Sequence, residues 1–132
     1  MEQGQLKAVP FFSGMSKSDL AAVAQQTDEV DVAAGKVLAR EGDFGEEFFL
    51  IETGTAQVTR GGEPIAELGA GDFFGEMALL EEDDRRNATV TATSPMSLIV
   101  MTRASFRALD RGHHDVHETV AKAIAERHAP LS

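Results

Sequence analysis

Residues 71–90 read GDFFGEMALLEEDDRRNATV, in which a short run of helix formers stands between segments typical of β-strands. The run over 76–80 follows Gly75 directly, and its residues have high helix propensity. A single helical turn entered through a glycine leaves its first backbone N–H groups without intrahelical acceptors. Arg86 follows at the entry to the next β-type run. The stretch therefore predicts an anion site inside a β fold.

On both sides of this stretch, short β-type runs alternate with glycine-containing turns between residues 30 and 101. Such regular spacing is typical of an all-β barrel or roll. The Gly61-Gly62 pair suits a tight hairpin with positive φ angles, and Pro64 predicts an edge strand. We expect an antiparallel, jelly-roll-like β roll (a double-stranded β-helix). Its predicted strands cover 30–32, 37–40, 48–52, 56–60, 63–68, 87–92 and 96–101.

Both ends of the sequence change to helical patterns. Residues 6–27 predict an N-terminal helix, in which Ser16 and Asp19 resemble a capping box. Thr102 is an N-cap candidate for a helix over 103–110, and a last helix is expected from about 114 to 129. The predicted fold class is mainly β with one N-terminal and two C-terminal helices. We expect one domain over 1–132, divided into 6–29 (helical), 30–101 (β roll) and 102–130 (helical).

The composition excludes several functions. The 132 residues contain no Cys, which excludes disulfides, Cys-ligated metals and thiol nucleophiles. The formal net charge of −10 repels phosphate backbones and anionic lipids, so neither nucleic acid nor membrane is an expected partner. Residues 1–7 contain no apolar h-region, so we expect no signal peptide, and no apolar run approaches the roughly 20 residues needed to span a bilayer. We expect a cytoplasmic protein.

Glu76 and Arg86 carry the chemistry of the predicted site. A guanidinium beside backbone amides suits a phosphate, whereas a carboxylate suits a hydroxyl donor such as a ribose 2′-OH. A phosphate and a sugar hydroxyl together describe a nucleotide. Arg85 is the competitor for the phosphate, but it is free to pair with the acidic residues 81–84. For Glu76 the alternative is an acid that stabilises the helix dipole.

These residues resemble the phosphate-binding cassette of cyclic nucleotide-binding domains. The specific part is Gly75-Glu76-Met77-Ala78-Leu79-Leu80 together with Arg86-Asn87-Ala88-Thr89-Val90. Phe48-Phe49-Leu50-Ile51, between Gly42-Asp43 and Gly54, is similar to early strands of that family. The resemblance covers residues 6–127 and places the cassette at 75–90.

The resemblance implies a non-catalytic sensor of cAMP, with cGMP as the alternative ligand and no further cofactor. It assigns Arg86 to the exocyclic phosphate oxygens and Glu76 to the ribose 2′-OH. Arg127 of the last helix, or a nearby aliphatic residue, would cap the purine. Binding would shift the C-terminal helices, which an effector protein or domain would read, and we expect a monomer. The other implied ligand-binding residues are Gly75, Met77, Ala78, Asn87 and Ala88.

Two alternatives remain open. The same fold could be an interaction module with a degenerate pocket, although Glu76 and Arg86 oppose this. A cupin-like enzyme would hold a metal on strand histidines, but here every histidine follows the predicted strands. His113 and His117, spaced for one helix face, lack a third ligand motif. The histidines are His113, His114, His117 and His128; the phenylalanines predicted to lie in the core are Phe44, Phe48, Phe49, Phe73 and Phe74.

Overall fold

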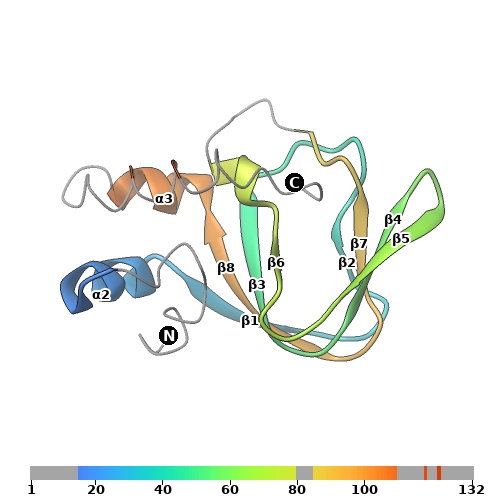
Figure 1. The fold of residues 1–132 in the computed structure, drawn as a ribbon, viewed down its shortest axis with the longest axis horizontal. Coiled ribbons are helices and arrows are strands. Elements are labelled where there is room, and N and C mark those ends of the chain that lie inside the picture. Colours follow the sequence, from blue (N-terminus) through green and yellow to red (C-terminus); the bar gives the residue numbers. More distant parts are fainter. Residues whose placement is uncertain (1–14, 80–84, 110–117, 119–121, 123–132) are drawn as a thin grey trace.

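The β-type runs pair into two four-stranded antiparallel sheets in the computed structural model, which describes residues 15–79, 85–109, 118 and 122. One sheet has the order β1-β8-β3-β6, and the other has the order β2-β7-β4-β5. Figure 1 shows the two sheets facing each other, which confirms the predicted antiparallel β roll. The strands are β1 (Asp28–Val32), β2 (Val37–Ala39), β3 (Glu47–Thr53), β4 (Ala56–Arg60), β5 (Glu63–Leu68), β6 (Phe73–Phe74), β7 (Thr89–Ala92) and β8 (Met96–Thr102).

The central strands β3 and β8 of the first sheet are mostly buried on both faces, whereas its edge strand β1 is exposed. In β3, Phe48 and Leu50 pack against the helices, whereas the alternate residues Phe49 and Ile51 face the second sheet. A strand covered on both faces reads as a continuous apolar run, because neither side-chain row meets water. This explains the run FFLI at 48–51. Between the sheets lie Ala56, Val58, Phe74, Val90, Leu98 and Val100, with others.

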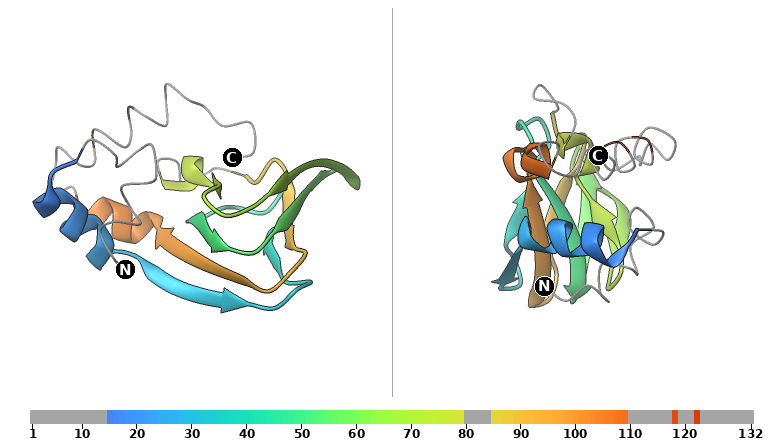
Figure 2. Two further views of the ribbon diagram at one scale, coloured as in Figure 1. Left: turned by 60° about the horizontal axis from the view of Figure 1, so that its bottom comes forward. Right: turned by 90° about the vertical axis from the view of Figure 1, so that its left-hand side faces the viewer.

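Two helices of the described chain lie at one end of the molecule, opposite the β4–β5 hairpin (Figures 1 and 2). Helix α2 (Lys17–Gln25) begins after Ser16, whose hydroxyl accepts a hydrogen bond from the Asp19 N–H at 3.2 Å. Helix α3 (Arg103–Leu109) begins after Thr102, whose hydroxyl accepts from the Ser105 N–H at 3.1 Å. Both N-caps were predicted and are confirmed.

The predicted helical ends lie partly outside the described residues. Residues 6–14 of the expected N-terminal helix and most of the expected helix over 114–129 fall there. Glu118 and Lys122 of the latter are helical. The domain boundaries therefore stay predictions at both ends.

The β4–β5 hairpin has the predicted turn. Gly61 and Gly62 have φ angles of 59° and 83°, which residues other than glycine rarely adopt. Pro64 lies in β5, at the edge of its sheet, where a missing N–H costs no ladder hydrogen bond. Both predictions are confirmed.

Three sequence predictions need correction. Phe44 was expected in the core but is 57% exposed, because it lies on an isolated bridge with Arg85 instead of in a strand. The two-residue strand β6 was not predicted. The strand expected from residue 87 begins at Thr89, since Asn87 and Ala88 form a bend.

Candidate functional site

Arg86 is the only polar or charged residue that is buried in the described part of the chain, at 7% exposure. Its Nη2 donates to the carbonyl oxygen of Glu47 at 2.7 Å. Its backbone is fixed as well, since the N–H donates to the Asp43 carbonyl and the carbonyl accepts from the Gly42 N–H, both at 2.8 Å. A buried charge is costly unless polar partners surround it, so such a residue often marks a functional site.

Two glycines let the backbone approach the guanidinium closely. A Cβ added at Gly45 would lie 2.6 Å from Cζ and Nε of Arg86. A Cβ added at Gly75 would lie 2.7 Å from Nη1 of Arg86 and 2.6 Å from the Glu47 carbonyl oxygen. Gly75 also has a φ of 81°, which favours glycine. Side chains at either position would push Arg86 out of its place.

The predicted helical turn of the cassette exists as the 3-10 helix η1 (Glu76–Leu79). Ala78 is fully buried, and its N–H donates to the Gly75 carbonyl at 3.1 Å, which closes the turn. Leu79 is buried in the apolar cluster between the helices and the first sheet, and Met77 packs against this cluster. Glu76 begins the turn, but its side chain lies outside the described part of the structure. The turn thus starts directly beside the Arg86 guanidinium.

Arg103, which sequence reasoning missed, ties this turn to α3. Its Nε donates to the Ala78 carbonyl at 2.8 Å, and its Nη2 donates to the Gly45 carbonyl at 2.6 Å. Its own N–H donates to the Glu46 carbonyl at 2.8 Å. No sequence motif includes Arg103, and an arginine at the start of a helix is ordinarily expected to be exposed to solvent.

Arg85 has the opposite environment to its neighbour. It is exposed, donates Nη1 to the Gly42 carbonyl at 2.8 Å, and lies 4.1 Å from the centre of the Phe44 ring. The cation–π contact explains why an exposed phenylalanine is tolerated there. The predicted pairing of Arg85 with residues 81–84 lies outside the described residues.

The remaining predicted site residues are divided between surface and core. Asn87 is exposed, and its carbonyl accepts from Nε of Arg60 at 2.9 Å. Ala88 is buried between the sheets. Arg127 lies outside the described residues. The structure therefore brings Gly75, Ala78 and Arg86 together, with Asn87 at the adjacent surface.

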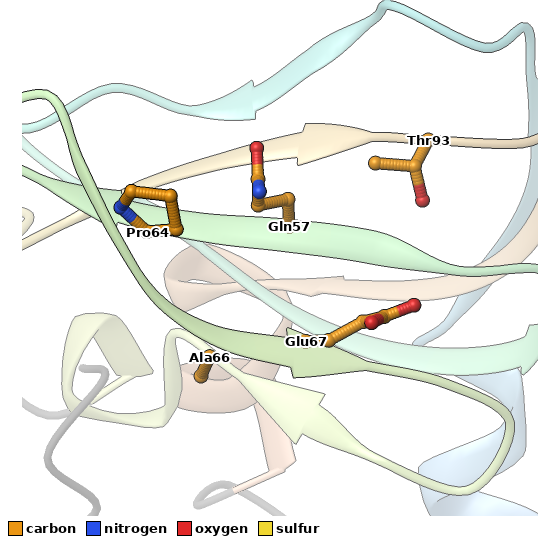
Figure 3. Close-up of a pocket in the computed structure, with 5 residues that line it drawn as sticks. All are labelled: Gln57, Pro64, Ala66, Glu67 and Thr93. Atoms are coloured by element: carbon orange, nitrogen blue, oxygen red, sulfur yellow. The ribbon is translucent and has the colours of Figure 1, made fainter.

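Two cavities of the described structure, one at Arg86 and one on the β4–β5 hairpin, have the same excess of acidic over basic side chains. A pocket of about 190 Å³ is lined by Arg40 and Arg86 but also by the carboxylates of Asp43, Glu46 and Glu47. A groove of about 320 Å³ on β4 and β5 is lined by Gln57, Pro64, Ala66, Glu67 and Thr93 (Figure 3). Carboxylates outnumber cations in both linings, which disfavours an anion there.

The described residues contain no group of three or more His, Cys, Asp or Glu side chains that could hold a metal ion. Every histidine lies outside the described ranges, so the prediction about them stays untested. Within those ranges, no helix is long and apolar enough to cross a membrane.

The chain belongs to the cyclic nucleotide-binding domain family, whose model matches residues 29–113, more than half of its length. A cyclic nucleotide-gated potassium channel of Rhizobium etli is 37% identical over 120 residues. A cAMP-dependent protein kinase regulatory subunit of Eremothecium gossypii is 39% identical over 105 residues. The solved catabolite activator protein of Thermus thermophilus has a TM-score of 0.75 and 29% identity. The resemblance inferred from the cassette is therefore confirmed.

The aligned regions cover most of this chain but only part of each relative. They span 91% of this chain and 33% of the channel, and 79% of this chain and 23% of the kinase subunit. For the activator protein the shares are 89% and 57%. The match therefore concerns one regulatory binding domain within larger proteins.

Proposed function

We propose that this chain is a non-catalytic cyclic nucleotide sensor, with cAMP as its preferred ligand and cGMP as the alternative. The observation that carries the proposal is the buried Arg86, whose guanidinium lies between Gly45 and Gly75 at the start of η1. A guanidinium held in a sheltered place gives a strong, oriented interaction with a phosphate. Relatives whose names refer to cAMP or cyclic nucleotides support the same ligand class.

Each cassette residue has a proposed role. Arg86 binds the exocyclic phosphate oxygens, and Glu76 accepts a hydrogen bond from the ribose 2′-OH. Gly75, Met77, Ala78, Asn87 and Ala88 complete the ligand-binding surface, and Arg127 caps the purine. The exposed position of Asn87 beside Arg86 is consistent with a contact to the nucleotide.

The output is proposed to run through the C-terminal helices. Binding would shift their position, and an effector protein or domain would read that shift. A protein of this kind needs no further cofactor, and we propose that it acts in the cytoplasm as a monomer. The alternative is an interaction module of the same fold without a nucleotide.

Calorimetric titration of the protein with cAMP, cGMP and non-cyclic 5′-AMP tests the proposal. We expect one cAMP per chain and little binding of 5′-AMP, because the dianionic, unconstrained phosphate fits the cassette less well. We expect cAMP and cGMP to differ by less than about 3 kcal/mol in binding free energy. A folded protein that binds neither cyclic nucleotide would favour the interaction module.

A further inference from the structure

Helix α3 reaches the candidate site through its first residue. Arg103 donates one hydrogen bond to the Ala78 carbonyl, at 2.8 Å, and another to the Gly45 carbonyl, at 2.6 Å. These two carbonyls belong to the segments that flank Arg86, since Gly45 lies against its guanidinium and Ala78 is in the turn that follows Gly75. Arg103 therefore holds both sides of the Arg86 environment from α3.

Apolar packing joins the same two elements. Leu79 of η1 lies in one buried cluster with Phe106 and Leu109 of α3. Figure 2 shows η1 and the start of α3 side by side. A displacement of η1 would therefore break hydrogen bonds to a charged donor and also disturb this packing.

We propose that Arg103 is a positioning residue of the nucleotide site, which fixes Gly45 and η1 against Arg86 and makes ligand affinity depend on the first turn of α3. This inference rests on the proposed function, since it concerns the same site. Linkage requires the dependence to be mutual, so a bound nucleotide stabilises the start of α3 by the same factor.

Two substitutions at this position provide the test. Arg103→Met keeps an unbranched apolar stem but removes both donors, whereas Arg103→Lys keeps the charge and loses the two-pronged geometry. Calorimetry with cAMP gives the affinity, and amide hydrogen exchange over 103–109, with and without cAMP, gives the response of α3. We expect about tenfold weaker binding for Arg103→Met, with a smaller loss for Arg103→Lys. The protection that cAMP adds to α3 in the wild type should disappear in Arg103→Met.

Arg107→Met is the matched control. Arg107 lies one turn further along α3 and is exposed, so both the affinity and the α3 response should stay at wild-type values. The melting temperature of each variant is measured alongside. A purely structural role of Arg103 would lower the melting temperature without changing the affinity.

Wild-type cAMP affinity and a wild-type exchange response in Arg103→Met would overturn the inference while leaving the proposed function intact. If Arg103→Met does not fold, the same two results in Arg103→Lys overturn it, whereas weakened binding and a reduced response support it. Absence of cAMP binding by the wild-type protein would instead contradict the proposed function, and this inference would fall with it.

Discussion

The position of the Arg86 side chain depends on the absence of a side chain at Gly45. Gly45 has an ordinary φ angle, so an alanine there would meet no backbone strain. Its Cβ, however, would lie within 2.9 Å of three atoms of the Arg86 side chain, so the arginine must move. The absence of a side chain at residue 45 is therefore a steric requirement for the position of Arg86.

Gly45→Ala should weaken cAMP binding by about tenfold, equivalent to about 1.4 kcal/mol, because the displaced guanidinium no longer meets the phosphate. Gly69→Ala is the control, since its added Cβ has no atom within 4 Å and its φ is not positive. It should leave the affinity unchanged and alter stability by less than about 1 kcal/mol. Calorimetry on both variants checks this, and equal affinities would refute the steric role of Gly45.

The sequence motif distinguishes Arg86 from Arg85, and the structure gives the two residues different environments, since Arg86 is buried and Arg85 is exposed. It could not anticipate that Arg85 covers Phe44, because that contact depends on a bridge between segments far apart in the chain. Arg103 was missed for a similar reason. Its acceptors are backbone carbonyls, which leave no mark on the sequence.

Strand β3 contributes buried side chains to two apolar clusters, one on each of its faces. Leu50 is buried against the helices and Ile51 is buried between the sheets, at 5% and 1% exposure. Successive residues of a strand point to opposite faces, so two separate apolar clusters meet at this strand. Residues 48–51 of β3 are therefore shielded from solvent on both faces of the strand.

Leu50→Ala and Ile51→Ala should each lower the free energy of unfolding by about 2–5 kcal/mol, since each leaves a cavity in a different cluster. Urea denaturation followed by circular dichroism measures both. Thr53→Ala, at an exposed position of the same strand, should change it by less than about 0.5 kcal/mol. A near-neutral effect of either core substitution would mean that only one face of β3 is structurally important.

The elements were predictable to different degrees for physical reasons. Gly61, Gly62 and Pro64 fix a hairpin and its edge position through local backbone geometry, so the sequence alone indicates them. Strand β6 has two residues and no alternating pattern, and its pairing of Phe74 with Phe49 depends on the tertiary fold. The rings of Phe49 and Phe74 stack with their centroids 4.8 Å apart, which adds to the backbone pairing of β6 with β3.

At the scale of the whole molecule, the formal charge of −10 sets the long-range electrostatics. A chain with this excess of carboxylates repels a phosphate backbone, so an anionic ligand must be bound by local groups such as Arg86. We expect no mobility shift of random duplex DNA at low salt, with or without cAMP. A shift that weakens as salt is added would show that a basic surface dominates instead.

The C-terminal segment is expected to contribute little to affinity compared with Arg86. No aromatic residue follows Phe106 in the sequence, so the base cannot stack on an aromatic side chain from that segment. Deleting residues 127–132 should therefore weaken cAMP binding by less than about tenfold in calorimetry. Loss of all binding on truncation would mean that this segment, and not the cassette, dominates recognition.

Arg86 is the residue proposed to hold the phosphate of a cyclic nucleotide, and the adjacent Arg85 offers the most direct comparison. Arg86 is buried, whereas Arg85 is exposed and stacks on Phe44. Losing a charge pair in a sheltered site costs about 2–5 kcal/mol, so Arg86→Ala should weaken cAMP binding by roughly thirtyfold or more. Arg85→Ala should change it little. Calorimetric titration of both variants with cAMP measures this, and equal losses of affinity would contradict the assignment of Arg86.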